Sequence, residues 1–369
     1  MANMENNIRI SVNNCIINYN DEGPSDAPVI IFIHGFPLSK SMWNEQFEAL
    51  KRNYRLIAYD IRGQGQSGEG NEDFSIDLFV KDLIGFMDAL KIEKAMLCGL
   101  SMGGYIALNA ILNFPKRFDA LILCDTNCMA DSPEAKEKRM NSIESINANG
   151  VERYANESLK KLFAPESFVT NKDKITVVKT MIMETSPKSI ARTLYALSRR
   201  TDTCDKLAEI KAPVLIIVGK EDKITPPAAA QLMQKNIKGS ILHIIEHAGH
   251  LSNIENAYEF NNHLITFVSS VNQRLDRQIK RDRLGTEVRN SRKAEKDTKT
   301  ENDLNSKILK VTMTIKDHYP ELSKYLDEMP MTVPSEKDPE ITLKHLQTYY
   351  ESLNSLLNKY KLDYPKIEE

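Results

Sequence analysis

Short apolar runs separated by helical patterns mark the chain up to about residue 271. Residues 8–20 alternate as in a strand, and a turn signal follows at residues 21–24. Later runs are continuously apolar and predict buried strands at 29–33, 54–59, 95–98, 120–124, 214–218 and 241–245. Helical patterns lie between them at 75–90, 103–113, 227–236 and 256–271. Because apolar strands that alternate with helices are typical of a parallel sheet covered on both faces, the pattern predicts an α/β fold with a mostly parallel sheet.

The interval between the fourth and fifth apolar runs, about residues 126–212, is much longer than a crossover between parallel strands requires. Helical patterns fall within it, for example over 143–162 and 189–198. We therefore expect a helical cap that is inserted into the α/β domain.

The composition changes after about residue 272. Residues 272–300 are rich in Arg and Lys and have few apolar positions, which predicts a charged helix extension or a linker. Residues 301–369 regain a helical period and predict a helical hairpin-like module. We therefore divide the chain into a domain over 1–271 with its cap at about 126–212, the charged segment, and the C-terminal module.

Two apolar stripes carry the prediction of this module. Asp338 and Pro339 form a good N-cap and first-turn pair for its last helix, and Pro330 and Pro334 fall in the loop before it. The stripes recur at spacings of three and four and form a heptad-like seam. Their residues are Leu304, Ile308, Val311 and Ile315, then Leu343, Leu346, Tyr350, Leu353, Leu357 and Tyr360. We expect this seam to pack within the module, on the first domain, or against a second copy or a protein partner.

The overall composition argues against several classes of protein. The chain has 369 residues, 41% hydrophobic and 27% charged, and its net charge of −2 does not favour nucleic acid or an anionic membrane as partner. No apolar run approaches the ~18 residues of a membrane span, and the first residues do not resemble a secretory signal, so we expect a cytoplasmic protein. Cysteines that are odd in number and lack metal-ligand spacing predict reduced thiols at Cys15, Cys98, Cys124, Cys128 and Cys204.

The strongest chemical signal is a serine between two glycines directly after the third apolar run. Residues 99–103 fit the pattern G-x-S-x-G, in which a strand turns sharply into a helix and presents the hydroxyl of Ser101 at the apex. Gly99 and Gly103 suit this turn because bulky side chains there would obstruct it. Chance alone supplies such a pentapeptide in roughly one chain in ten of this length. The interpretation therefore depends on the residues around it.

A serine nucleophile needs a base that takes its proton and a carboxylate that orients the base. Asp222 follows the fifth apolar run and His250 follows the sixth, so Ser101, Asp222 and His250 all fall at the carboxyl ends of predicted strands. Two alternatives stay open. His247 lies three residues before His250, and Asp125 follows the fourth run, where it would supply the acid instead.

The loop after the first apolar run resembles the oxyanion loop of alpha/beta hydrolases. Residues 34–37 read H-G-F-P, and Gly35 allows the backbone to turn the Phe36 N–H toward the nucleophile. Together with the Met102 N–H it forms the expected oxyanion hole, whose donors stabilise charge that develops only during the reaction.

The loop after the second run resembles the D-x-R-G-x-G-x-S loop of the same family. It spans residues 60–67 and includes Asp60 and Arg62. We expect structural roles for these two residues and for His34, because charged and polar side chains in turns brace the backbone beside an active site.

Residues 1–271 as a whole resemble an alpha/beta hydrolase, and more narrowly the carboxylesterase and 3-oxoadipate enol-lactonase branch. Residues 98–104 and 249–253 carry that resemblance. It implies an alpha/beta-hydrolase fold and a serine esterase that forms an acyl-enzyme with a small carboxylic ester or lactone, without metal or cofactor. C–C bond or thioester hydrolysis by the same residues, and ligand binding without catalysis, stay as alternatives. Residues 272–369 lie outside the resemblance.

We expect the substrate to lie beneath the cap in a mostly apolar pocket. The expected contacts are Phe36, Trp43, Met102 and Leu251. The cap adds looser candidates, which are Met140 and Met181 for apolar contact and Arg192, Arg199 and Arg200 for a substrate carboxylate.

Overall fold

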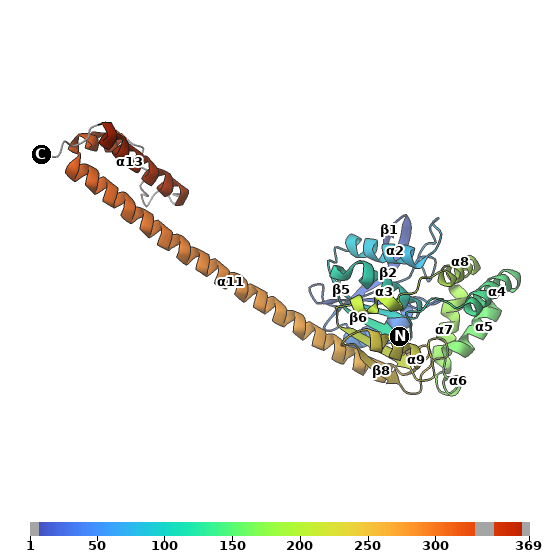
Figure 1. The fold of residues 1–369 in the computed structure, drawn as a ribbon. Helices are drawn as coiled ribbons and strands as arrows, with labels where there is room; N and C mark the ends of the chain where they lie inside the picture. The colour runs from blue at the N-terminus through green and yellow to red at the C-terminus, as the bar shows by residue number, and fades with distance from the viewer. Residues whose placement is uncertain (1–6, 329–342, 364–369) are drawn as a thin grey trace. The chain divides into compact units, whose positions relative to one another are not determined.

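The computed structural model describes residues 7–328 and 343–363, without the side chains of 278–279, 282–295, 325, 327–328 and 363. The chain divides into two compact units, Met1–Arg274 and Leu275–Glu369. The first unit is an α/β domain with a helical cap, and the second consists of helices (Figure 1).

An eight-stranded sheet forms the centre of the first unit, in the order β1-β2-β4-β3-β5-β6-β7-β8. Its strands are β1 (Ile8–Val12), β2 (Cys15–Glu22), β3 (Val29–Ile33), β4 (Arg55–Tyr59), β5 (Ala95–Leu100), β6 (Phe118–Cys124), β7 (Val214–Gly219) and β8 (Ile241–Ile245). The pairs β1–β2 and β2–β4 are antiparallel, and the other neighbours are parallel. The predicted strands are confirmed. The inner strands β3, β5, β6 and β7 are buried along nearly their whole length, as parallel strands covered on both faces are, whereas Ile241 and Ile244 of the edge strand β8 are exposed although burial was predicted.

The alternating segment near the N-terminus forms a hairpin of two strands. Asn13 and Asn14 separate β1 from β2 and have φ values of 46° and 58°. Two successive residues at positive φ are what a tight two-residue hairpin turn requires, and Asn tolerates this region. The sequence pattern did not predict the reversal, because no glycine or proline marks it.

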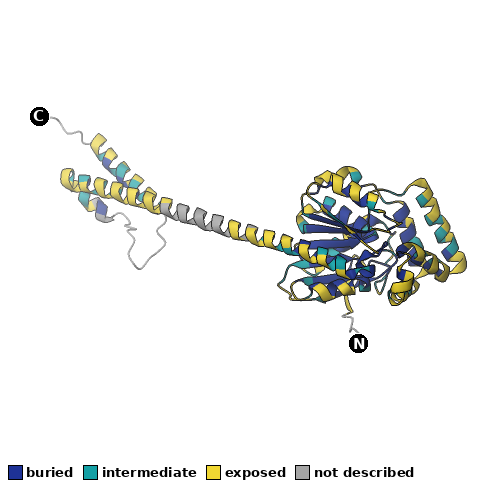
Figure 2. Ribbon diagram, turned by 90° about the horizontal axis from the view of Figure 1, so that it is seen from below, coloured by how far each residue is buried: buried dark blue, intermediate teal, exposed yellow. Residues whose placement is uncertain are grey.

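Helices cover both faces of this sheet. Those outside the cap are α1 (Asn44–Leu50), α2 (Ile76–Ala89), α3 (Met102–Asn113), α9 (Pro227–Asn236), α10 (Ser252–Glu255) and the first part of α11 (Ala257–His318). Ile31 and Ile33 of β3 belong to the apolar core that includes α2, α3 and α9. Phe32 points to the opposite face, where its ring lies 5.1 Å from Trp43 and 5.6 Å from Phe47 of α1 between centroids. Figure 2 shows the strands as the buried centre of this unit.

The cap is inserted between β6 and β7 and lies to one side of the sheet (Figure 1). Its helices are α4 (Pro133–Asn149), α5 (Val151–Leu162), α6 (Ser167–Thr170), α7 (Lys172–Glu184) and α8 (Pro187–Ser198). The helical pattern over 143–162 is interrupted at Gly150, whose φ of 77° ends α4 before α5 begins. Glycine adopts this conformation without strain, so the chain changes direction there.

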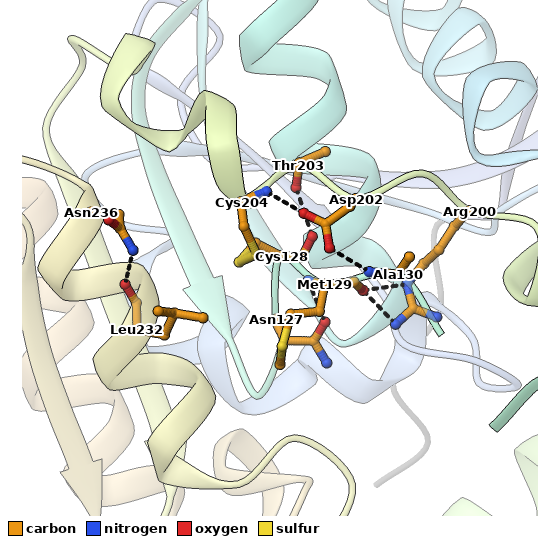
Figure 3. Close-up of a disulfide and its surroundings, with 10 residues drawn as sticks. All are labelled: Asn127, Cys128, Met129, Ala130, Arg200, Asp202, Thr203, Cys204, Leu232 and Asn236. Carbon is orange, nitrogen blue, oxygen red and sulfur yellow. Dashed lines mark hydrogen bonds between the residues drawn. A yellow bond between two sulfur atoms is a disulfide. The ribbon is translucent and has the colours of Figure 1, made fainter. Parts of the chain in front are cut away.

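A disulfide joins the two ends of the cap insertion (Figure 3). Cys128 follows β6 and bonds to Cys204, 76 positions later, at the start of the helical turn η3 (Cys204–Glu209). The Thr203 N–H donates to the Cys128 carbonyl at 2.9 Å, and the Asp202 carboxylate accepts from the N–H groups of Ala130 at 3.1 Å and Cys204 at 2.8 Å. The expectation of reduced thiols is therefore wrong for this pair, which only the fold brings together. The cysteines that remain free are Cys15, Cys98 and Cys124.

The second unit contains the remainder of α11, which is 62 residues long in all, together with further helices. These are η4 (Pro320–Leu322), α12 (Ser323–Glu328) and α13 (Leu343–Asp363). The charged segment 272–300 is continuous helix, and its described side chains are largely exposed (Figure 2). An apolar core joins the helices through Ile315, Leu322, Leu326, Leu353 and Leu357. The predicted N-cap and loop residues Asp338, Pro339, Pro330 and Pro334 lie outside the described residues.

Within the described ranges, no helix combines the length and the apolar character that crossing a bilayer requires.

Candidate active site

Ser101 occupies a strained turn between β5 and α3. Its φ is 54°, in the left-handed region that few non-glycine residues adopt. The flanking glycines permit this turn, since a Cβ on Gly99 would lie 2.3 Å from the Gly103 carbonyl oxygen and one on Gly103 would lie 2.1 Å from that of Ile33. The segment thus has the strand–turn–helix geometry that the G-x-S-x-G pattern requires.

His250 lies within hydrogen-bond distance of this serine. Its Nε2 is 2.8 Å from the Ser101 hydroxyl oxygen, and its Nδ1 is 2.8 Å from the Asp222 carboxylate. Asp222 also accepts from the N–H groups of Ile224 at 2.8 Å and Thr225 at 3.0 Å, and from the Thr225 hydroxyl at 2.6 Å. The structure therefore brings the three predicted residues together at the carboxyl ends of β5, β7 and β8, where parallel strands gather the loops that follow them.

Burial and charge act in opposite directions on this acid–base pair. Burial favours the neutral form of Asp222, but His250 and the hydrogen bonds from Thr225 outweigh it and lower the pKa of the carboxyl. Burial also favours neutral His250, yet the charge and hydrogen bond of Asp222 raise the pKa of the imidazole above its ordinary value. An ionised Asp222 can therefore stabilise His250 after the imidazole has taken a proton.

Asp125, the alternative acid, points to other partners. It follows β6, is fully buried, and has a φ of 44°. Its two oxygens accept from the Gly219 N–H at 2.8 Å and from the Ser252 hydroxyl at 2.5 Å. Burial and the nearby Asp222 charge raise the pKa of the Asp125 carboxyl well above its ordinary value. Of the two acids, Asp222 has the hydrogen bonds and the neighbouring imidazole that stabilise a negative charge, whereas burial and the charge of Asp222 outweigh the hydrogen bonds of Asp125 and favour a retained proton there.

Two other histidines near the site have partners of their own. His247 is on the surface, with its side chain 73% exposed and its Nδ1 3.0 Å from the Glu166 carboxylate. His34 is fully buried, and burial lowers its pKa. Its Nε2 accepts from the Ile61 N–H at 2.9 Å and its Nδ1 donates to the Gly35 carbonyl at 2.8 Å. His34 thus braces two loops beside the serine, as expected.

The loop after β4 uses its charged side chains within the fold. The Asp60 carboxylate lies 3.0 Å from Lys40 Nζ, with both side chains buried, and also accepts from the Gln66 N–H at 2.9 Å. Arg62 donates to the two oxygens of Asp82 at 2.7 and 2.8 Å. Breaking a buried ion pair by removing one partner costs about 3–5 kcal/mol, so loss of either partner should destabilise this loop.

The oxyanion loop lies against the candidate nucleophile. A Cβ on Gly35 would lie 3.0 Å from the Leu100 side chain and 3.5 Å from the Ser101 Cβ, so glycine suits this close approach. Met102 is the first residue of α3, where the backbone N–H has no carbonyl partner within the helix. Phe36 and Met102 both line the cavity at Ser101, which is where oxyanion donors are needed.

A cavity of about 280 Å³ lies beneath the cap and reaches Ser101 and His250. The cap helices α4 and α5 each turn one helical face toward it. These faces carry Ala135, Lys138, Arg139 and Ser142 on α4 and Tyr154, Ser158, Lys161 and Leu162 on α5. None of the described residues that line this cavity is acidic. Elsewhere in the described ranges, no three His, Cys, Asp or Glu side chains are grouped so that they could hold a metal ion.

The four expected substrate contacts separate into two pairs. Phe36 and Met102 line the cavity. Trp43 packs against Phe32 in the buried core on one face of the sheet, and neither Trp43 nor the fully buried Leu251 belongs to the cavity lining. The sequence does not distinguish the core from the pocket for Trp43, because a large aromatic side chain close to the expected oxyanion loop can pack in either. In the structure it packs in the core.

The cations that line the cavity are Lys138, Arg139 and Lys161, none of which was predicted from the sequence. The cap residues proposed from the sequence lie outside the lining, namely Met140, Met181, Arg192, Arg199 and Arg200. A signal for the cavity-lining cations on α4 exists, because the lining positions of that helix recur at i, i+3, i+4 and i+7. Choosing that face from the sequence would have required the helix boundaries at Gly150.

Arg139 belongs to a cluster with excess positive charge. The Asp131 carboxylate, 5% exposed, contacts the guanidinium groups of both Arg139 and Arg200, which lower its pKa despite burial. The Arg200 guanidinium lies 4.4 Å from the centroid of the Tyr105 ring, which also lines the cavity. One carboxylate between two guanidiniums leaves a net positive charge, and Arg139 presents that charge to the cavity.

Comparison with known proteins identifies the family. The sequence profile of the alpha/beta hydrolase fold matches residues 28–257. The chain belongs to the alpha/beta hydrolase family. Among proteins of this family, 3-oxoadipate enol-lactonase 1 of Acinetobacter baylyi is 31% identical over 249 residues, which cover 68% of this chain and 91% of that protein.

Two solved alpha/beta hydrolases resemble it in structure. A thermophilic esterase from Thermogutta terrifontis is 30% identical, with a TM-score of 0.68 and coverage of 72% of this chain and 98% of its own. An enol-lactonase from Burkholderia xenovorans is 27% identical, with a TM-score of 0.67 and coverage of 71% and 100%. This alpha/beta hydrolase thus has esterase and enol-lactonase relatives, which support hydrolase activity on esters or lactones.

Proposed function

We propose that this alpha/beta hydrolase is a serine hydrolase that cleaves a small carboxylic ester or lactone through an acyl-enzyme intermediate. Ser101 is the nucleophile, His250 is the general base, Asp222 orients it, and the N–H groups of Phe36 and Met102 bind the oxyanion. The observation that carries this proposal is the pair of 2.8 Å contacts, from Ser101 to His250 and from His250 to Asp222.

The proposed reaction has two halves. In the first, the Ser101 oxygen attacks the ester carbonyl carbon while His250 Nε2 takes the hydroxyl proton. His250 then gives this proton to the leaving alcohol or enol oxygen as the C–O bond breaks, and the acyl group stays on Ser101. In the second half, His250 takes a proton from water, the hydroxide attacks the acyl carbon, and Ser101 leaves with the proton. Asp222 stays ionised throughout and stabilises the imidazolium.

The cavity favours a substrate that carries a negatively charged group. Lys138, Arg139 and Lys161 line it, without an acid among its described lining residues. The charge of Arg139 is not fully neutralised, because Asp131 is shared with a second arginine. A substrate carboxylate could accept charge-assisted hydrogen bonds from these groups, which are stronger than neutral ones. The relative from Acinetobacter baylyi, a 3-oxoadipate enol-lactonase by name, supports a lactone as the reacting group.

Matched substrates test this proposal. p-Nitrophenyl esters of equal acyl length, ending in either a methyl group or a carboxylate, should both be hydrolysed, with the higher kcat/KM for the carboxylate. An enol-lactone, a thioester and a vinylogous diketone complete the panel. Turnover of the diketone but of no ester would favour C–C bond hydrolysis, and binding without turnover of any member would favour a ligand-binding protein.

The second unit supports a further proposal, that residues 301–369 bind a second copy of the chain or a protein partner. This unit has its own apolar core around Ile315 and Leu353, and the family match ends at residue 257. The mass of the full-length chain in solution tests the first of these options. A monomer at every concentration would exclude the second copy.

A further inference from the structure

Glu255 is a buried carboxylate between the loop that carries His250 and the cap. It belongs to α10, directly after that loop, and is 7% exposed. One of its oxygens accepts from the Gly249 N–H at 2.8 Å. The other accepts from the Ala164 N–H at 2.8 Å and from the Ser167 hydroxyl at 2.6 Å. These contacts all come from donors, which favour the ionised carboxylate, although burial outweighs them and raises the pKa of Glu255 above its ordinary value.

The cap and the histidine loop are also in direct backbone contact around this carboxylate. The His250 N–H donates to the Leu162 carbonyl at 2.8 Å. A Cβ on Gly249 would lie 2.7 Å from the Ala164 nitrogen, so glycine suits the close approach of the two segments. Leu162 itself lines the cavity above Ser101. The main chain that carries the proposed base is therefore held by the main chain of the cap.

We propose that Glu255 is a positioning residue that makes the cap part of the machinery orienting His250 toward Ser101. This inference rests on the proposed function of Ser101. Glu255 bonds to both segments, so a shift of cap residues 162–167 is transmitted to Gly249 and to the imidazole beside it. Catalytic groups must be held within about 0.5 Å of the productive geometry. Loss of the contact should therefore lower kcat more than it changes KM.

The charges around His250 give a second readout. The groups concerned are the carboxyls of Asp222 after β7, Asp125 after β6 and Glu255 on α10, and the cations Lys138, Arg139 and Lys161 in the cavity lining. Burial lowers the pKa of His250, and the negative charge of its neighbours, Asp222 above all and Glu255 to a lesser extent, raises it, with a net increase. Removing the charge of Glu255 should therefore lower the pKa of His250, whereas a change that leaves this charge and the contact between His250 and Asp222 in place would not.

The variant E255Q separates the two sides of this contact. Glutamine has one acceptor oxygen, whereas the carboxylate uses two. In one orientation, the amide oxygen of the introduced glutamine accepts from the Gly249 N–H, and its NH₂ group then faces the Ala164 N–H, where two donors meet. In the other orientation, the oxygen accepts from the Ala164 N–H, and the Gly249 N–H loses its acceptor. E166Q is the matched control, because Glu166 belongs to the same cap segment but contacts His247 on the surface.

The experiment measures kcat, KM and the pH dependence of kcat/KM for the full-length wild type, E255Q and E166Q, normalised to active sites titrated with a fluorophosphonate probe. For E255Q we expect kcat to fall by about tenfold or more and KM to change by less than about threefold. The acidic limb of the kcat/KM profile of E255Q should move to lower pH, whereas the profile of E166Q should match that of the wild type. Equal kcat and an equal acidic limb in E255Q and E166Q would overturn the inference.

The variant S167A keeps the test decisive if E255Q does not fold. It removes one cap-side donor of Glu255 and leaves the Gly249 contact in place. We expect kcat to fall about threefold with little change in KM, and a kcat equal to that of E166Q would overturn the inference. A wild type that the probe does not label at Ser101 would instead refute the proposed function, so the two failures are distinguishable.

Discussion

The Nε2 atom of His250 lies 2.8 Å from the hydroxyl oxygen of Ser101, although the two residues are 149 positions apart in the chain. The turn after β5 holds the serine, and the loop after β8 holds the histidine. The strands β5, β6, β7 and β8 are consecutive neighbours in the sheet, so their register sets this distance. The cap is inserted between β6 and β7, outside these pairings, which is why a large insertion is compatible with the site.

Asp222 and Asp125 should differ sharply when each is replaced by asparagine. D222N should lower kcat/KM by about 10³–10⁴-fold, because the amide cannot stabilise the imidazolium and favours the wrong tautomer of His250. D125N should retain most activity, because the carboxyl of Asp125 favours a retained proton and asparagine can still accept from the Gly219 N–H. Steady-state kinetics of the two purified variants measure this difference. A large loss in D125N with little loss in D222N would show that the acid is Asp125.

The strands and the order of the site residues were predictable because burial leaves a simple pattern. Parallel strands covered on both faces are apolar throughout, so runs such as 214–218 stand out from the helical spacing around them. Ser101, Asp222 and His250 each follow such a run, and parallel strands bring their carboxyl ends to one edge. Chain order therefore predicted that these loops meet there, but it left Asp125 open as the acid, since Asp125 also follows an apolar run.

The details of the cap were not predictable, because they depend on contacts that leave no local pattern. The reversal at Gly150 determines which face of α4 and α5 lines the cavity, and with it the roles of Lys138 and Arg139. The bond between Cys128 and Cys204 joins positions that only the completed sheet brings together.

The pH dependence of the reaction should reflect the raised pKa of His250. Burial lowers this pKa, but the neighbouring carboxyl groups, Asp222 foremost, together raise it by more, so the net shift is upward from about 6.5. His250 must be neutral to accept the serine proton, and kcat/KM should therefore fall as the pH drops through the raised pKa. In D222N the pKa of His250 is lowered, because the charge of Asp222 is lost. The acidic limb of the kcat/KM profile should therefore move to lower pH, and its plateau should be lower than that of the wild type. Rates measured from about pH 5 to 9 test this, and an acidic limb that D222N leaves in place would contradict it.

Arg139 should matter only for substrates that carry a negative charge. R139Q removes one guanidinium and leaves Asp131 paired with Arg200, so the excess positive charge of this cluster disappears while Lys138 and Lys161 stay in the cavity lining. We expect kcat/KM for the carboxylate-bearing ester to fall about 10–100-fold and that for the neutral ester by less than about threefold. R153Q is the matched control, because Arg153 lies on α5 but is 67% exposed and paired with Glu157. Equal losses on both esters in R139Q would contradict the proposed charge recognition.

The disulfide between Cys128 and Cys204 should stabilise the attachment of the cap. Its two cysteines are 76 positions apart, and a cross-link that closes a long loop contributes about 2–4 kcal/mol to the free energy of unfolding. The double variant C128S/C204S should therefore have a Tm several degrees lower, measured by thermal denaturation. A reductant should lower the Tm of the wild type to the same value and leave the variant unchanged. An identical Tm for the oxidised wild type and the double variant would contradict this role.

Covalent labelling with a fluorophosphonate tests the central claim most directly, because the probe reacts with an activated serine and leaves a stable adduct. Peptide mass spectrometry of the labelled wild type should place one adduct on Ser101, and S101A should gain no mass and hydrolyse no ester. An adduct on another residue, or full labelling and activity in S101A, would contradict the assignment of Ser101 as the nucleophile.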